Sequence, residues 1–96
     1  MATFIVLLDF TDQGVRNLKD SPQRADAFNA YAEKAGVQIL GQYWTIGSHD
    51  GVLILEAPSE EVAASVLLHL AAGGNVRTTT LRAFDWAEAQ DLILSE

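Results

Sequence analysis

The chain contains no cysteine among its 96 residues. Disulfide bonds, zinc sites built on thiolates and catalysis by a cysteine nucleophile are therefore excluded. Two histidines, His49 and His69, are too few to supply the usual ligands of a zinc site, so we expect no metal. No nucleotide-binding glycine fingerprint and no Ser-His-Asp order stands out, and we expect no cofactor.

Basic residues are also scarce. The chain has 6 of them against 13 acidic residues, which gives a formal charge of −7. They are scattered and form no polybasic run: Arg16, Lys19, Arg24, Lys34, Arg77 and Arg82. Such a field repels phosphate backbones and anionic lipid surfaces, so we expect neither nucleic acid nor a membrane as partner.

Long hydrophobic runs are absent as well. The apolar run 4–8 near the N-terminus stops at Asp9, and no basic leader precedes it. This run is too short for a signal peptide or a membrane span. We therefore expect a cytoplasmic protein that begins with a β-strand.

What the chain does have is apolar surface, because 49% of its residues are hydrophobic. A chain of this length forms a single domain, 1–96, and buries only about 60–65% of the surface that its unfolded form exposes. The interior of a single subunit is therefore too small to bury all of these apolar side chains. Self-association into a homodimer or a larger homo-oligomer is the expected remedy.

Hydrophobic periodicity and turn residues divide the chain into alternating strands and helices. Thr11 to Gly14 offers capping and turn chemistry, and a short helical turn is expected at 15–19. Ser21 is the expected N-cap of the first long helix, whose apolar stripe excludes Arg24, and Ser59 caps the second. Asp85 and Glu88 form a capping box. The expected strands are 4–8, 37–46, 51–57 and 75–84, and the expected helices are 22–35, 60–72 and one after Asp85.

This order, βαββαβ with a terminal helix, predicts an α+β fold: a ferredoxin-like antiparallel sheet with both main helices on one face. The strands at 4–8 and 52–55 offer apolar side chains to both faces of the sheet. Two helices cover only one face. A second copy of the chain, packed sheet against sheet, is the simplest cover for the other.

The candidate catalytic residues are His49, at the tip of the hairpin at 42–57, and Asp9. His49 could act as a general base, and Asp9, which ends the first strand, is the alternative base. The structural alternative makes the tip a tight turn in which Asp50 caps backbone amides and His49 faces water. The structural alternative for Asp9 is that its carboxylate forms a hydrogen bond with the turn at 11–14. Neighbours on a strand point to opposite faces, so His49 and Asp50 do not simply form one dyad.

Five residues are candidates for ligand binding: Tyr43, Trp44, Asp50, Arg77 and Arg82. Tyr43 and Trp44 are adjacent on a strand, so one ring is expected in the core and the other in a pocket or dimer seam. Arg77 and Arg82 also fall on opposite faces, so at most one of them can hold an anionic ligand in a shared pocket. His69, beside an apolar helix stripe, is expected at a boundary of the core.

Three blocks of the sequence, in this order, resemble the GYD domain family of small bacterial and archaeal proteins. The blocks are 11–22, with its Thr-Asp-Gln-Gly and Lys-Asp-Ser-Pro segments; 47–58, where Gly-Ser-His-Asp precedes an apolar strand; and 74–83. The signature of the family has a tyrosine at the place where this chain has His49, between Gly47 and Asp50. The resemblance implies a ferredoxin-like subunit in a dimeric α/β-barrel assembly, for a family without a settled activity.

Three hypotheses of function remain open. The first is a homo-oligomeric small-molecule-binding protein, with the ligand between sheet and helices. The second is a cofactor-independent enzyme, similar to an oxygenase or isomerase, that acts on a small apolar or aromatic carbonyl compound. The third is a structural or accessory subunit of a larger complex.

Overall fold

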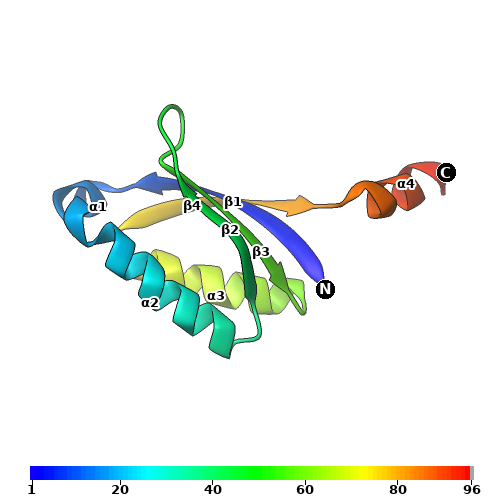
Figure 1. Ribbon diagram of the computed structural model, residues 1–96, viewed down its shortest axis with the longest axis horizontal. Helices are drawn as coiled ribbons and strands as arrows, with labels where there is room; N and C mark the ends of the chain where they lie inside the picture. Colours follow the sequence, from blue (N-terminus) through cyan, green and yellow to red (C-terminus); the bar gives the residue numbers. More distant parts are fainter. Residues whose placement is uncertain (96) are drawn as a thin grey trace.

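The computed structural model describes residues 1–95 and has the predicted α+β architecture (Figure 1). A four-stranded antiparallel sheet has the strand order β2-β3-β1-β4. The elements, in chain order, are β1 (Ala2–Phe10), α1 (Asp12–Arg16), a 3-10 turn (Leu18–Asp20), α2 (Ser21–Lys34), β2 (Gln38–Trp44), β3 (Gly51–Ala57), α3 (Glu60–Ala72), β4 (Val76–Ala83) and α4 (Trp86–Leu94).

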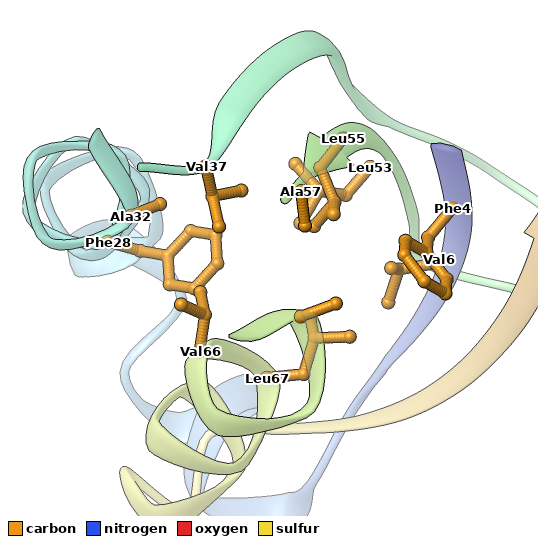
Figure 2. Packing of buried hydrophobic residues seen from close by; sticks show 11 residues of the cluster. Phe4, Val6, Phe28, Ala32, Val37, Leu53, Leu55, Ala57, Val66 and Leu67 are labelled. Atoms are coloured by element: carbon orange, nitrogen blue, oxygen red, sulfur yellow. The ribbon is translucent and has the colours of Figure 1, made fainter. Parts of the chain in front are cut away.

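Helices α2 and α3 pack side by side on one face of the sheet, as expected (Figure 1). The core lies between these two layers, where Phe4, Val6, Leu53 and Leu55 meet Phe28 of α2 and residues of α3 (Figure 2). Burial along β3 alternates strictly, because successive side chains of a strand point to opposite faces.

The opposite face of the sheet has no helix over it within residues 1–95 (Figure 1). The strand register brings apolar side chains together there: Ile5 and Leu7 of β1, Val52 and Ile54 of β3, and Leu81 of β4. We call this the open face. These five residues are partly or fully accessible, so the two-faced apolar sheet predicted from the sequence is present in the subunit.

Local capping signals explain where several helices begin. The Ser59 hydroxyl accepts from the backbone amide of Val62, and Asp85 and Glu88 form the reciprocal capping box, so both predictions are confirmed. The capping chemistry expected at 11–14 is present, because the Thr11 hydroxyl accepts from the backbone amide of Gly14 and caps the short helix α1, which begins at Asp12 and not at the expected Val15. The Thr11 hydroxyl also donates to the carbonyl of Gly74 at 2.6 Å, which fixes α1 against the start of β4.

Helix α4 follows β4 after only two residues and extends away from the body of the molecule (Figure 1). Its apolar side chains are exposed: Trp86, Leu92, Ile93 and Leu94. None of the helices in the described part of the chain is both long and apolar enough to cross a membrane.

Candidate functional site

A cavity of about 260 Å³ lies between the helices and the sheet, at the end of the sheet where β3 begins and β1 ends. It opens between the first half of α2, the end of α3 and the strand ends. Most of its wall is apolar, and the apolar side chains that line it are Leu8, Phe10, Phe28, Trp44, Leu53, Leu70 and Val76. The cavity is therefore an extension of the hydrophobic core that reaches the surface.

Small residues leave this space open. Ala25 and Ala27 stand on the α2 side, and Gly51 starts β3 on the floor of the cavity. A Cβ atom at Gly51 would lie 3.1 Å from the Tyr43 carbonyl oxygen and 3.3 Å from Cδ1 of Leu8, tighter than ordinary van der Waals contact. The close packing of the strand ends thus depends on glycine at this position.

Trp44 lines one side of the cavity, and a hydrogen bond to α2 that the sequence did not predict holds its ring there. Its indole Nε1 donates to the Ser21 hydroxyl at 3.0 Å. Ser21 is the first residue of α2 and is buried, whereas Asp20 occupies the N-cap position and makes no side-chain cap. The prediction that Ser21 caps this helix was therefore wrong: its hydroxyl joins α2 to β2 instead.

Arg24 is the basic residue of the cavity wall. Its Nη1 donates to the carbonyl of Asn17 at 2.8 Å, while its Nη2 is buried and has no hydrogen-bond partner. A buried donor without a partner costs about 1–3 kcal/mol, and more when it is charged. The sequence reading placed Arg24 away from the apolar stripe of its helix, and this was wrong because Arg24 shares a cavity wall with Phe28, one helical turn further on.

Asp50 also lines the cavity, at the start of β3. Its Oδ2 accepts from the backbone amide of Phe10 at 2.9 Å, and its own amide donates to the Leu8 carbonyl at 2.8 Å. These two bonds fasten the tip of the hairpin to the end of β1. The expectation that Asp50 caps a backbone amide agrees with this geometry, although the amide lies 40 residues away in sequence.

His49 and Asp9 meet outside the cavity. The His49 Nδ1 lies 3.2 Å from Oδ1 of Asp9, and the two side chains are 36% and 40% exposed. Neither lines the cavity. The contact differs from both simpler expectations, because Asp9 faces His49 instead of the 11–14 turn and His49 is only partly in water. An imidazole beside a carboxylate can move a proton, but here the pair is open to solvent.

The two candidate arginines of β4 lie apart from the cavity as well. The register sets Arg77 opposite Asp9 on the open face, and Arg82 opposite Phe4 on the helix face. The Arg82 guanidinium lies 4.3 Å from the ring centroid of Phe84 and donates to the backbone of Thr3 and Ala83. The two arginines thus lie on opposite faces, as their spacing indicated.

Tyr43 borders the cavity from the edge of the sheet. Its ring lies over Gly41, where a Cβ atom would come within 3.1 Å of Cε2 of the ring. Its neighbour Trp44 points to the other face. Neither ring enters the core, because both side chains are more than half exposed.

His69 of α3 lines the cavity and stacks on Tyr31 of α2, with 3.7 Å between the ring centroids. The stack closes the gap between the two helices. Within residues 1–95, no three His, Asp or Glu side chains come together in a way that could hold a metal ion.

The sequence reading named Tyr43, Trp44 and Asp50, which line the cavity, but it missed Arg24 and Phe28 as site residues. A signal was present, because positions 21, 24 and 28 follow one another at helical spacing. The apolar stripe expected for this helix includes Phe28, which is indeed in the core, and leaves Arg24 outside it.

Comparison with known proteins agrees with this fold. The family model of the GYD domain matches residues 4–93. The "Glutamine synthetase and cystathionine beta-lyase binding protein" of Thermus thermophilus is 39% identical over 89 residues, which are 92% of this chain and 94% of that protein.

Two solved structures share the fold at low sequence identity. The crystal structure of FFRP-DM1 has a TM-score of 0.62 at 15% identity and covers 88% of this chain and 100% of its own. The Leucine response regulatory protein LrpA of Mycobacterium tuberculosis has a TM-score of 0.58 at 18% identity, over 88% of this chain and 51% of its own. At such identities the likeness concerns the fold alone.

Proposed function

Because the chain belongs to the GYD domain family, whose model matches residues 4–93, we propose that it is a homo-oligomeric small-molecule-binding protein. The cavity is the observation that carries this proposal. It is preformed, mostly apolar and has a few polar groups in its wall, including Arg24, Asp50 and His69. Small-molecule sites in proteins have these properties.

The open face supports self-association. It presents Ile5, Leu7, Val52, Ile54 and Leu81 across three adjacent strands, and apolar patches of this kind mark interaction surfaces. A second subunit that packs its own open face against this one would bury both. The proposed assembly leaves the helix layers, and with them the cavities, on the outside of the dimer.

Native mass spectrometry of the protein purified gently from its host tests both parts. We expect a dimer or larger oligomer that carries the additional mass of a small molecule. A monomer at micromolar concentration would contradict the assembly, whereas an oligomer of bare subunits would leave only the ligand in question.

A charge on the open face locates the interface. Leu81→Glu should dissociate the oligomer, because it would bury a carboxylate in the interface without a partner. The matched control is Leu68→Glu on α3, which is 70% exposed where Leu81 is 46% exposed. Light scattering after size exclusion should show a monomer for the first variant and the wild-type assembly for the second. The same mass for both variants would place the interface elsewhere.

A second candidate function is that of an accessory protein that binds a metabolic enzyme. The name of the Thermus relative favours it, since that protein is described by its binding to glutamine synthetase and cystathionine β-lyase. Helix α4 offers a surface for such contact, with Trp86 78% exposed and Ile93 70% exposed.

A binding assay with the two enzymes of the host tests this candidate. Immobilised wild-type protein should retain one of them, and Ile93→Asp should weaken retention while Leu68→Asp, on a different helix, should not. If neither enzyme is retained at micromolar concentration, the accessory role toward these enzymes is refuted.

The geometry gives less support to a cofactor-independent enzyme. Its candidate bases, His49 and Asp9, lie outside the cavity, so a substrate held there would not meet them. Binding without chemistry is therefore the function that we propose for the cavity.

A further inference from the structure

One buried hydroxyl group in the cavity wall has a proton without an acceptor. Ser21 is the one buried polar residue within residues 1–95, with 8% of its surface exposed, and it lines the cavity. Its Oγ accepts from the Trp44 indole at 3.0 Å but donates to no group in the described part of the chain. A hydroxyl has one proton and two lone pairs, so the indole occupies a lone pair and the proton remains free.

The usual local acceptor for this proton is occupied. In helices a serine hydroxyl often donates to the carbonyl four residues earlier, which here is that of Asn17. That carbonyl already accepts from Nη1 of Arg24 at 2.8 Å and from the Asp20 amide at 3.0 Å, and a carbonyl oxygen has two lone pairs. Because a buried donor without an acceptor is unfavourable, the Ser21 proton calls for an acceptor within the cavity that Ser21 lines.

We propose that the ligand of this cavity is an uncharged molecule with an apolar, ring-sized body and one acceptor oxygen, to which the Ser21 hydroxyl donates. The inference rests on the proposed function, since it assigns a chemical class to the ligand of the same cavity. The bond from the Trp44 indole orients the hydroxyl. It also makes the hydroxyl a stronger donor, because hydrogen bonds in series polarise one another.

The charges of the wall favour an uncharged ligand. Arg24 and Asp50 contribute one charge of each sign, so an ion of either sign would meet a like charge. Both are engaged within the chain: Nη1 of Arg24 binds Asn17 and its Nη2 is buried, while the Asp50 carboxylate holds the Phe10 amide. An ionised group without a free partner is costly to bury in an apolar cavity.

The amide side chains of the wall are already paired. Gln42 exchanges two hydrogen bonds with Asn29, and the Asn75 side chain accepts from Gln13. The His69 ring is exposed, so water serves its nitrogens without a ligand. The serine hydroxyl is therefore the buried donor that selects for an oxygen on the ligand.

The rest of the wall determines the body of the ligand. Phe28, Leu53 and Leu70 present apolar surface in a space of about 260 Å³. A dry apolar cavity of about 150 Å³ is enough for a benzene molecule in an engineered protein. A six-membered ring with a short arm that carries the oxygen is thus of suitable size.

Three probes of nearly equal shape test the oxygen and the charge. Acetophenone carries a carbonyl oxygen, α-methylstyrene has a CH₂ group in its place, and benzoate has the same outline with a negative charge. The Trp44 indole N–H, bonded to Ser21, reports the binding of each in a ¹⁵N-correlated NMR titration of the full chain. All three are compared in 1 M salt, where the Debye length is about 3 Å, so that the net charge of −7 does not repel benzoate at long range. We expect acetophenone to bind about tenfold or more tightly than benzoate.

Ser21→Ala assigns the hydrogen bond. It should weaken the binding of acetophenone about two- to tenfold, the range for one neutral hydrogen bond exchanged with water, and should not weaken that of α-methylstyrene. Ser65→Ala, at an exposed position of α3 outside the cavity, is the matched control and should leave both affinities unchanged. Ser21→Cys keeps the shape with a weaker donor and should also weaken acetophenone.

A measurement on the wild-type chain needs no variant, so it remains decisive if the Ser21 variants do not fold. Acetophenone labelled with ¹³C at its carbonyl should give a bound signal downfield of its position in cyclohexane, because a hydrogen bond withdraws electron density from the carbonyl carbon. A bound signal at the cyclohexane position would overturn the inferred hydrogen bond.

Each outcome decides a different claim. Equal weakening of acetophenone and α-methylstyrene by Ser21→Ala, or no weakening of either, would overturn the role of Ser21. Benzoate that binds as tightly as acetophenone would overturn the uncharged class. Both results leave the cavity as a binding site, whereas failure of all three probes to shift the Trp44 signal at millimolar concentration would overturn the proposed function together with the inference.

Discussion

Replacement of Asp50 by alanine should loosen the junction between the hairpin and β1. Its carboxylate is the acceptor for the Phe10 amide at 2.9 Å, in a partly buried position. Without it the amide has no acceptor in the sheet, which costs about 1–3 kcal/mol. For a domain of this size each kcal/mol lowers the melting temperature by about 4–8 °C, so we expect a decrease of about 4–24 °C.

Asp50→Asn is the matched control. Asparagine keeps one side-chain oxygen at the same distance from the backbone to accept from Phe10, while it loses the charge and replaces the other oxygen by an NH2 group, so its effect should stay under about 1 kcal/mol. Calorimetry measures the stability of both variants, and amide hydrogen exchange followed by NMR measures protection at Phe10. The alanine variant should lose protection at Phe10 more than at Val6 in the middle of the strand. A melting temperature within 2 °C or so of the wild type, with Phe10 still protected, would refute the reasoning.

Three further predictions concern packing and caps. Leu55→Ala should lower the free energy of unfolding by about 2–5 kcal/mol in urea denaturation, because Leu55 is fully buried between the sheet and the helices; a loss under about 1 kcal/mol would contradict that placement. Gly14→Ala should prevent stable folding or lower the melting temperature strongly, because the new Cβ would collide with the Asn75 backbone carbonyl. The control Gly73→Ala should be tolerated, because its Cβ would meet only ordinary contacts. Equal melting temperatures of the two variants would argue against the close approach of α1 to β4. Ser59→Ala should cost about 0.5–2 kcal/mol, measured by chemical denaturation, since it removes the N-cap of α3, and an unchanged midpoint would show that the cap adds nothing.

The fold could be predicted from the sequence where the signals are local. Apolar alternation and glycines defined the hairpin, and Ser59 and Asp85 marked the starts of two helices because caps act within three residues. Thr11 has the same cap chemistry, but its sequence left both a cap and a turn open, because only a short helix follows it. Ser21 failed as a cap because an indole from another element competes for its hydroxyl.

The site was harder to predict because it is made by contacts between distant parts of the chain. His49 and Asp9 are 40 residues apart, and only the register of β1 on β3 brings them together. Arg24 lies on α2, beside Ala25 of the apolar stripe, and the sequence does not define the edge of that stripe to within one residue. Nor does the sequence show that a cavity remains between α2 and the sheet next to Arg24. The continuous apolar runs at 4–8 and 52–55, in contrast, were enough to predict a sheet with two apolar faces.

The strand order has a consequence for the way this chain is made. β1 is synthesised before the other three strands of its sheet, yet it is a central strand whose neighbours are β3, complete at Ala57, and β4, complete at Ala83. Until those segments are synthesised, the apolar run of β1 has no partner and its backbone groups stay unpaired, which is the condition that invites aggregation and chaperone binding. The nascent chain thus cannot complete its sheet until β4 has been synthesised, 73 residues after the end of β1 at Phe10.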